Sequence, residues 1–527
     1  MASCSCVNNE ARECCRKQCA LLGRLQAFGR GMDRSAMERA IMAEPQISFG
    51  ERNFGGADLG DERRSRRLPK LVDEMQRHPG GTLPQKLPRP EDIEAFYRLC
   101  HADDVTHQSV MNPHRQRTLQ YLQSSSHFVL AIHDATELDY TTLSTLTPDL
   151  GQIGNGNQRG YLAQNTLVVD PRRGAVVGLA NQILHVRPKI RKGETQAQRR
   201  QRNSRESLLW LKGTVDLPAR REVVDVCDRG ADTFEFFEHE VRSGRTFVIR
   251  STHSRRIECG HEPGGTREML HAHARRLPEL GSCELAVSQK VIVKKPKKNG
   301  KKTRVVRTKR LARLSIAAAA VKVCAPSSKN GIHGNEPLPM WIVRVWEASP
   351  PLGEQPLEWL LLTNHPVTTA DAALLVKTWY EWRWTVEELH KAMKTGCAIE
   401  SLQFHDVDRM EPAIAILSIL SLMLLALRDA GRDPQARTRP AREYLDEEYI
   451  EVLSLWRHRN SRPEWTQHEF YMALGRLGGH SGRKKSPPPG WIVLWRGWEK
   501  LQLMIDGARV AMLRQQLNAN KSCHKCA

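Results

Sequence analysis

The sequence predicts an α/β fold in which a strand-rich core is interrupted by a second strand-rich segment and flanked by helical regions. Two apolar runs, HFVLAIHDAT from residue 127 and EVVDVCDRGAD from residue 222, are typical of buried strands, and each leads into an acidic residue. Residues 253–355 are rich in Val, Ile, Arg and Lys and poor in helix signals, whereas residues 401–527 have a mostly helical pattern. At roughly 100–200 residues per domain, a chain of 527 residues has room for several domains.

The N-terminal part predicts an extension followed by a small helical domain. Residues 1–45 carry no clear helix or strand signals, and residues 46–118 carry two helical segments, the second beginning near Pro90. Asp61 can cap the first helix, whose exposed side carries Arg63, Arg64 and Arg67. Arginines on one helix face suit DNA phosphates or base edges, and an ordinary solvated face is the alternative.

The charge of the chain indicates a polyanionic partner. The formal net charge is +21, which suits nucleic acid or an anionic membrane. The longest apolar run, Ala413–Leu427, is shorter than the about 20 residues of a membrane span, so we expect a buried core helix there. The N-terminus lacks the apolar segment of a signal peptide, so we expect a cytoplasmic protein that contacts DNA.

Residues 119–252 have the element order of one recognisable core. After the strand at residue 127, YLAQNTLVVD and GAVVGLANQILHV predict two more strands, followed by a short helix. The strand leading to Asp228, a helix in DTFEFFEHEVRSG and a strand in RTFVIRST complete the order. This is the order of an RNase H-like α/β fold. Sites in open α/β sheets lie at the carboxyl ends of strands, where we expect Asp134 and Asp228.

The rest of the chain completes and extends this core. We expect residues 253–355 to form an inserted β subdomain, with Lys294–Arg304 as a basic hairpin tip. That tip either contacts the DNA backbone, which the overall charge favours, or is a solubilising loop. Residues 356–400 should return to the core with a strand and one long helix, from about Thr369 to Thr395. Residues 401–527 should form a helical C-terminal region suited to dimerisation.

The long helix carries four polar side chains at a spacing that places them together. Tyr380, Arg383, Glu387 and Lys394 fall within roughly 60° of one another around an ideal helix. Glu388 lies about 100° away, so the helical phase selects Glu387 from the Glu-Glu pair. A surface stripe of ordinary ion pairs is the alternative interpretation.

Three carboxylates from two strand ends and one helix suit a magnesium site. Asp134, Asp228 and Glu387 can hold two Mg²⁺ ions about 3.5–4 Å apart, one activating a water or 3′-hydroxyl and the other stabilising the leaving oxygen. Mg²⁺ prefers carboxylate oxygens and keeps several waters, so few protein ligands are needed. Mn²⁺ can take its place.

The motifs resemble those of the insertion-sequence-four family of DDE transposases. The family's Tyr-x2-Arg-x3-Glu-x6-Lys signature fits without a gap at Tyr380, Arg383, Glu387 and Lys394. Further similar segments are ADLGDERRSRR, IHDAT, RGYLAQNTLVV, VCDRGAD, FVIRS, PLEWLLLT and EELHKAMKTG, so the resemblance spans about residues 48–430.

The resemblance implies a role for each matching residue. Asp134, Asp228 and Glu387 would be the catalytic, metal-binding triad. Trp359 would stack on a flipped base beside the cut, with plain core packing as the alternative. Phosphates near the transferred end would be held by Tyr380, Arg383 and Lys394, and the transposon ends by Arg63, Arg64 and Arg67.

The resemblance also implies a reaction. A homodimer would bring two inverted-repeat ends together, cut them, in some relatives through a hairpin, and join the 3′-hydroxyl ends to target DNA. Where a near relative has an acid before the first aspartate, this chain has His133, which could tune Asp134. Two other functions remain open: an inactive DNA-binding regulator of transposition, and an RNase H-like nuclease without strand transfer.

Overall fold

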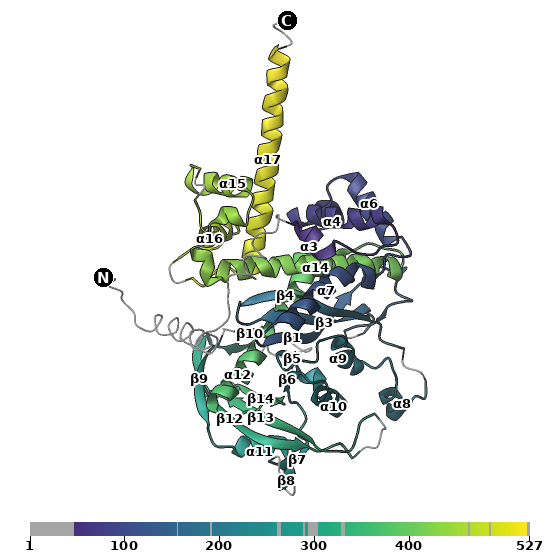
Figure 1. The fold of residues 1–527 in the computed structure, drawn as a ribbon, viewed down its shortest axis with the longest axis vertical. Helices are drawn as coiled ribbons and strands as arrows, with labels where there is room; N and C mark the ends of the chain where they lie inside the picture. Colours follow the sequence, from purple (N-terminus) through teal and green to yellow (C-terminus); the bar gives the residue numbers. More distant parts are fainter. Residues whose placement is uncertain are drawn as a thin grey trace, which may run out of the picture.

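The computed structural model describes residues 47–523, with gaps at 155, 190–191, 261–264, 288–289, 294–303, 328–331, 462–463 and 484–485 (Figure 1). The predicted extension over residues 1–45 and the basic tip lie outside the described residues. The described chain is a mixed α/β protein with a helical N-terminal region, a large mixed sheet and a helical C-terminal region.

The N-terminal helices pack around their own apolar side chains. They are α3 (Phe49–Phe54), α4 (Glu62–Arg77), α5 (Leu83–Lys86) and α6 (Pro90–Cys100). The Asp61 carboxylate caps α4 by accepting a hydrogen bond from the Arg63 amide at 2.7 Å, as the sequence predicts. Leu68, Val72 and Phe96 are fully buried between these helices.

Helix α7 (His107–Ser124) joins this helical region to the sheet through a buried histidine. The His114 Nδ1 donates to the Asn53 side chain of α3 at 2.8 Å, and its Nε2 accepts from the Leu179 amide of strand β4 at 2.9 Å. Burial lowers the pKa of His114 to about 3. The neutral ring therefore connects α3, α7 and β4.

The sheet contains both antiparallel and parallel pairs. Its order is β2-β3-β1-β5-β6-β14-β13-β12-β7-β8, with β4 also on β3 and β9 on β12. Strand β1 pairs with β3 in antiparallel fashion and with β5 in parallel fashion. The first six strands are β1 (Val129–Asp139), β2 (Gly151–Gln152), β3 (Arg159–Asp170), β4 (Ala175–His185), β5 (Val223–Cys227) and β6 (Thr246–Arg250).

Strand β1 continues beyond the point that the sequence pattern predicts. Its parallel pairing with β5 ends at His133 opposite Cys227, but its antiparallel pairing with β3 continues to Asp139 opposite Gly160. Asp134 is therefore not at the end of the strand. It lies where the parallel pairing stops, level with Asp228 just after β5, so the two aspartates still share one edge of the parallel pairs.

The strands of the predicted insertion continue the core sheet. Strand β14, which lies in the predicted second part of the core, pairs with β6, and β13 and β12 of the insertion follow outward in antiparallel order. The outer edge of β14 is thus paired by the insertion instead of being left open. The strands are β7 (Arg256–Cys259), β8 (Arg267–Met269), β9 (Gly281–Val287), β12 (Arg310–Val323), β13 (Leu338–Trp346) and β14 (Glu358–Thr363). A two-stranded sheet, β10 (Lys290–Val293) with β11 (Arg304–Arg307), forms the predicted hairpin strands.

The single long helix expected from Thr369 to Thr395 is divided into three pieces. Helix α12 (Ala370–Glu381) ends in a turn, α13 (Trp384–Lys391) follows, and residues Ala392–Gly396 form a π-helical turn. At the break, the Arg383 amide bonds to the Tyr380 carbonyl at 3.1 Å and the Thr385 amide to the Trp382 carbonyl at 2.9 Å. These three-residue bonds interrupt the regular helix, yet Arg383 still pairs with Glu387 and lies over the Tyr380 ring, whereas Lys394 pairs with Glu400.

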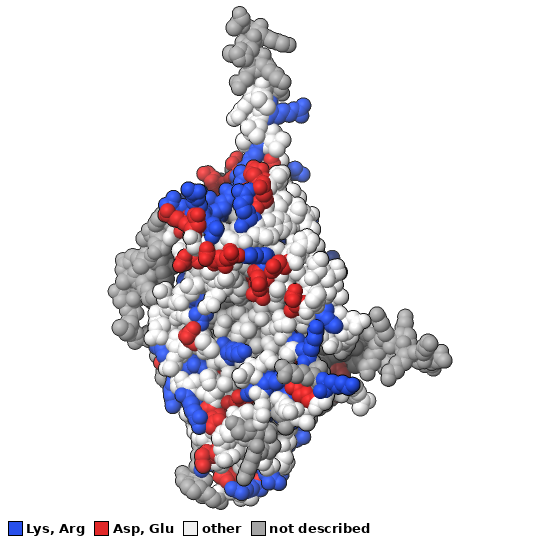
Figure 2. All heavy atoms as spheres, turned by 90° about the vertical axis from the view of Figure 1, so that its right-hand side faces the viewer, with Lys and Arg blue, Asp and Glu red and all other residues white. Residues whose placement is uncertain are grey.

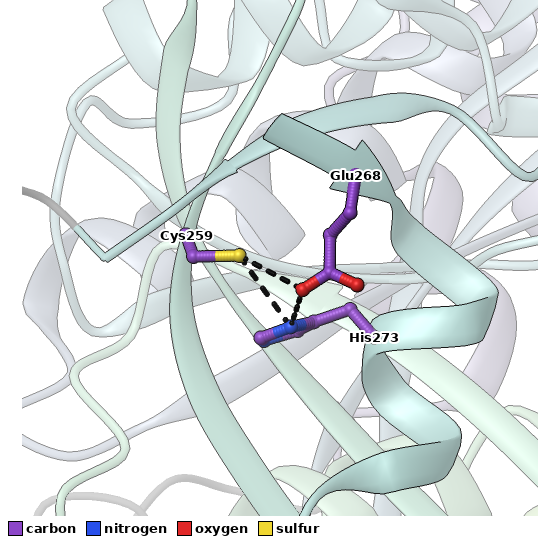
Figure 3. A group of neighbouring side chains, drawn as sticks. All are labelled: Cys259, Glu268 and His273. Carbon is purple, nitrogen blue, oxygen red and sulfur yellow. Dashed lines mark hydrogen bonds and ion pairs between the residues drawn. The ribbon is translucent and has the colours of Figure 1, made fainter. Parts of the chain in front are cut away.

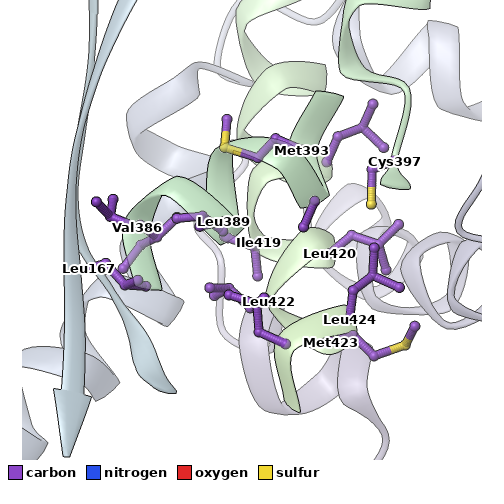
Figure 4. Close-up of a cluster of buried hydrophobic side chains, with 14 of the residues drawn as sticks. Leu167, Val386, Leu389, Met393, Cys397, Ile419, Leu420, Leu422, Met423 and Leu424 are labelled. Atoms are coloured by element: carbon purple, nitrogen blue, oxygen red, sulfur yellow. The ribbon is translucent and has the colours of Figure 1, made fainter. Parts of the chain in front are cut away.

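The long helix α14 (Val407–Arg432) crosses the molecule between the sheet and the terminal helices (Figure 1). It is long and apolar enough to span a membrane, but 89% of its most apolar window is buried, so it is a core helix. Figure 4 shows Val386 and Leu389 of α13 between Leu167 of β3 and the α14 side chains Ile419 and Leu422. This packing fixes α13 against the sheet.

The remaining helices surround this core. On the sheet side they are α8 (Gln196–Arg200), α9 (Leu208–Gly213), α10 (Phe234–Arg242) and α11 (Leu270–Arg276), with the short 3-10 turn η1 (Arg229–Ala231). The C-terminal region adds α15 (Glu447–His458), α16 (Gln467–Leu477) and α17 (Trp491–Cys523). The 3-10 turn η3 (Ile399–Ser401) precedes α14, and the turns η4 (Pro434–Arg437) and η5 (Ala441–Glu443) lie between α14 and α15. Helix α17 extends well beyond the rest of the fold (Figure 1).

Candidate active site

Two aspartates mark the candidate site at the β1–β5 edge. Asp134 is largely buried, and one of its oxygens accepts the Ala135 amide at 2.8 Å. Asp228 caps the short η1 turn by accepting the Gly230 amide at 2.7 Å. These local bonds orient each carboxylate and leave other lone pairs for a cation.

Glu387 of α13 reaches the same site, and Arg383 bridges the two elements. The Arg383 guanidinium donates to Asp134 at 2.9 Å, and its other terminal nitrogen forms an ion pair with Glu387. Because Arg383 lies at the break between α12 and α13, the turn places its guanidinium between strand and helix. Two members of the predicted triad therefore share one arginine.

The electrostatics of Asp134 connect all three carboxylates. Burial raises the pKa of Asp134 to about 7, and the negative charges of Asp228 and Glu387 add to the rise, while Arg383 opposes it. The charged form of Asp134 thus has less positive charge around it than it needs. A divalent cation would supply that charge.

The three carboxylates are near one another without forming a tight cluster. Within the described residues, they do not make a group whose oxygens all lie within 4.8 Å of one another. The donor set is all carboxylate, which fits Mg²⁺.

The aromatic rings of Tyr380 and Trp359 pack against each other near Arg383. Their rings meet edge to face with centroids 5.8 Å apart, and the Arg383 guanidinium lies 6.0 Å from the Tyr380 ring centre. Tyr380 is only 5% exposed and Trp359 is half-buried on β14. Tyr380 therefore helps to position Arg383, and Trp359 keeps part of its ring accessible.

Lys394 lies farther along, in the π-helical turn. Its ammonium group forms an ion pair with Glu400 at 3.2 Å, and Glu400 also accepts the Asp139 amide at 2.9 Å. The positive charge of Lys394 contributes to lowering the pKa values of Glu137 and Asp139. Lys394 thus faces the far end of β1 rather than the Asp134 carboxylate.

His133 points away from the site, into a buried charge network on the other face of the sheet. Its Nε2 donates to Asp225 at 2.7 Å, and Asp225 also accepts from Arg245 at 2.5 Å. Arg245 makes a further ion pair with Glu240 at 3.3 Å. His133 therefore holds the β1–β5 pair together, and any effect on Asp134 passes through the backbone.

Two buried residues beside the site were not found by motif reasoning. Asn165 on β3 lies opposite Asp134 in the strand register, and its amide donates to His390 of α13 at 3.1 Å. Gln182 on β4 donates to the Asn165 carbonyl oxygen at 2.8 Å. The signal in the sequence is a run of polar residues, Gln-Asn-Thr, inside an otherwise apolar strand. These bonds fix the position of α13 relative to β1.

Most arginines of α4 are already paired within the protein. Arg64 pairs with Asp104 at 3.3 Å, and Arg67 pairs with Asp92, whose side chain is 3% exposed. Among the described residues, Arg63 is exposed and has no ion pair. Figure 2 shows basic and acidic side chains mixed at the height of α4 and α6. The surface free to contact a phosphate is therefore narrower than the sequence suggests.

Comparison with known families identifies the N-terminal helices. Residues 47–105 match the family model described as transposase DNA-binding, a range that contains α3 to α6. The helical N-terminal region is thus a DNA-binding domain of the transposase type, and the match supports a transposase with DNA as its partner. Among the described residues, α14 is the one helix long and apolar enough to cross a membrane, and most of it is buried within the fold.

Proposed function

We propose that the chain is a cut-and-paste transposase of the DDE class, with an RNase H-like core and two divalent ions held by Asp134, Asp228 and Glu387. The observation that supports this best is the meeting of these carboxylates from β1, the end of β5 and α13 beside a transposase DNA-binding domain. We further propose that its motifs place it in the insertion-sequence-four family, with a likeness to the transposase of the bacterial kanamycin-resistance transposon.

The protein groups have distinct tasks in this proposal. When bound, the ions activate the attacking water or 3′-hydroxyl and stabilise the leaving oxygen. Asp134, Asp228 and Glu387 hold the ions. Arg383, which pairs with Asp134 and Glu387, would hold a DNA phosphate near the transferred end.

Phosphate and base contacts surround the metal site. Lys394 would hold a phosphate beyond the end of β1, and Tyr380 would support the Arg383 guanidinium. Trp359, half-buried on β14, would offer its ring for an unstacked base to stack on. Arg63 would contact the transposon end, with Arg64 and Arg67 mainly stabilising the domain that presents it.

The active form in this proposal is a homodimer that holds two transposon ends. The projecting part of α17 leaves several large apolar side chains exposed: Leu503, Val510, Met512, Leu513 and Leu517. Leu503, Val510 and Leu517 recur every seven residues, the spacing of a two-helix contact. Replacing Val510 and Leu517 with Glu should convert a dimer to a monomer in light-scattering measurements, and an unchanged mass would remove α17 from the interface.

The proposal is tested by reaction with DNA that carries the element's own ends. Wild type and Asp228→Ala would be compared with and without Mg²⁺, and the products resolved on a denaturing gel. Metal-dependent cuts at the ends and joined products, both absent in the variant, are expected, and a hairpin band would identify the cleavage route. Cuts without joining would indicate a nuclease. End binding without cuts under any metal would indicate a regulator.

A further inference from the structure

Three side chains of different chemistry converge at the outer end of the sheet, on elements remote from the carboxylate site in the strand order. Cys259 ends β7, Glu268 lies on β8 and His273 lies on α11 (Figure 3). The Cys259 sulfur lies 3.1 Å from a Glu268 oxygen and 3.5 Å from His273 Nδ1. The same Glu268 oxygen lies 2.7 Å from His273 Nδ1. Among the described residues, no other three His, Cys, Asp or Glu ligand atoms lie this close together.

Sulfur, imidazole nitrogen and carboxylate oxygen are the three ligand types of protein zinc sites. Tetrahedral zinc with ordinary bond lengths would separate the sulfur from the nitrogen by roughly 3.6 Å and the nitrogen from the oxygen by roughly 3.4 Å. The distance between the Cys259 sulfur and His273 Nδ1 is already close to this value. The Glu268 oxygen would have to move away from the other two ligand atoms by at most about 0.7 Å. Flexible side chains make such a movement without a change in the strands.

The surroundings of the three side chains direct one ligand atom of each toward the other two. His273 turns Nδ1 toward Cys259 and Glu268, while its Nε2 is buried without a hydrogen-bond partner in the described part of the chain. Arg276 forms an ion pair with the second Glu268 oxygen, which leaves the first oxygen directed at Cys259 and His273.

We propose that Cys259, Glu268 and His273 form a zinc-binding site, with solvent as the fourth ligand. On binding, the Cys259 thiol releases its proton to solvent, and the His273 proton resides on Nε2 while Nδ1 binds the ion. One thiolate and one carboxylate then balance the two positive charges of zinc. The ion would fasten the β7–β8 hairpin to α11 at the edge of the sheet.

Metal content of the full chain tests this site. The chain has 13 cysteines, so the informative quantity is the difference between variants. After chelation and reloading with zinc, wild type should retain one more equivalent than Cys259→Ser or His273→Gln. Cys283→Ser is the matched control, because Cys283 is a half-buried cysteine on β9 outside the cluster, and it should retain the wild-type amount. Equal zinc in all four proteins would overturn the proposal.

Two further measurements separate loss of the site from loss of the fold. Cobalt(II) in wild type should give a thiolate-to-cobalt charge-transfer band that Cys259→Ser lacks and Cys283→Ser keeps. Hydrogen exchange of the wild-type chain requires no substitution: zinc should slow exchange in residues 256–276 and leave the β1–β5 region unchanged. Exchange in residues 256–276 that does not respond to zinc would contradict the proposal even if the variants fail to fold.

Discussion

His133 and Asp134 are neighbours on β1, but their side chains lie on opposite faces of the sheet and in opposite electrostatic conditions. On one face, His133 and Arg245 surround Asp225. Burial alone would raise the pKa of Asp225, but the Arg245 charge and the His133 hydrogen bond outweigh it and hold the pKa below its usual range. On the other face, burial and nearby carboxylates raise the pKa of Asp134 to about 7.

The contrast between Asp225 and Asp134 distinguishes a carboxylate that stabilises the fold from one whose charge the protein compensates only in part. Asp225 has its positive charge built into the protein, whereas Asp134 shares a single arginine with Glu387. The same contrast holds within the Glu387–Glu388 pair. Glu388 forms an ion pair with Arg428 of α14, away from the aspartates. Acidic residues that are neighbours in the sequence thus differ in their ion-pair partners, and these partners indicate whether an acid stabilises the fold or belongs to the candidate site.

The largest expected effect is on stability, from the buried face. Asp225→Ala should lower the free energy of unfolding by about 3–5 kcal/mol, because it leaves the Arg245 guanidinium buried without its main partner. Asp228→Ala should change it by less than about 1 kcal/mol, since Asp228 is half-exposed at a strand end. Urea denaturation of both variants would measure this, and equal losses would end the distinction between the two faces.

The second prediction concerns the pH dependence of stability that arises from His114, the buried histidine between α7 and β4. The pKa of His114 is about 3 in the native protein and its ordinary value is 6.5. Between these two pH values, the unfolded chain binds a proton at this histidine and the native protein does not. In the folded protein, Nε2 accepts from the Leu179 amide, and Arg117 adds unfavourable positive charge. Stability from this group is therefore full above pH 6.5 and is lost as the pH falls from there towards 3.

The predicted slope is up to about 1.4 kcal/mol per pH unit for this histidine. His114→Gln should flatten the dependence of unfolding free energy on pH between 6 and about 4 by this amount. His405→Gln is the control, because His405 is exposed, and it should keep the wild-type slope. A slope that His114→Gln leaves unchanged would show that other groups dominate acid destabilisation.

The smallest expected effect sharpens the comparison within the DNA-binding domain. Arg63→Ala should weaken end binding and reduce the dependence of log affinity on log salt by about 1, because one phosphate contact is lost. Arg67→Ala should chiefly lower the melting temperature of the domain, because Asp92 loses an ion pair. Filter binding across a salt series would distinguish them. Identical salt slopes for wild type and Arg63→Ala would show that Arg63 does not contact a DNA phosphate.

The sequence predicts the elements of the core well because they depend on local patterns. The apolar runs before Asp134 and Asp228 are strands, and the run from Ala413 to Leu427 lies in a buried helix. The extension of β1 to Asp139 depends on its partner β3, which no local pattern reveals. In the same way, the pairing of β13 with β14 joins the predicted insertion to the core sheet, and no local pattern reveals it.

The site is predictable only in part for a similar reason. Helical phase separated Glu387 from Glu388, and the two glutamates do face different partners. The break at Trp382–Arg383 was not predictable from phase, since it arises from backbone bonds that replace the regular helix. Nor does spacing show that Arg67 is committed to Asp92, because that contact joins residues 25 positions apart.

The most direct test of the catalytic face compares Glu387→Gln with its neighbour Glu388→Gln. Both would be assayed for Mg²⁺-dependent cleavage of end DNA, with end binding measured in parallel. Glu387→Gln should lose cleavage by at least about 100-fold while keeping end binding, because it removes a proposed metal ligand, and even the groups that orient such ligands contribute about 10–100-fold. Glu388→Gln should cleave at close to the wild-type rate. Retained cleavage in Glu387→Gln, or equal losses in the two variants, would contradict the assignment of Glu387 to the metal site.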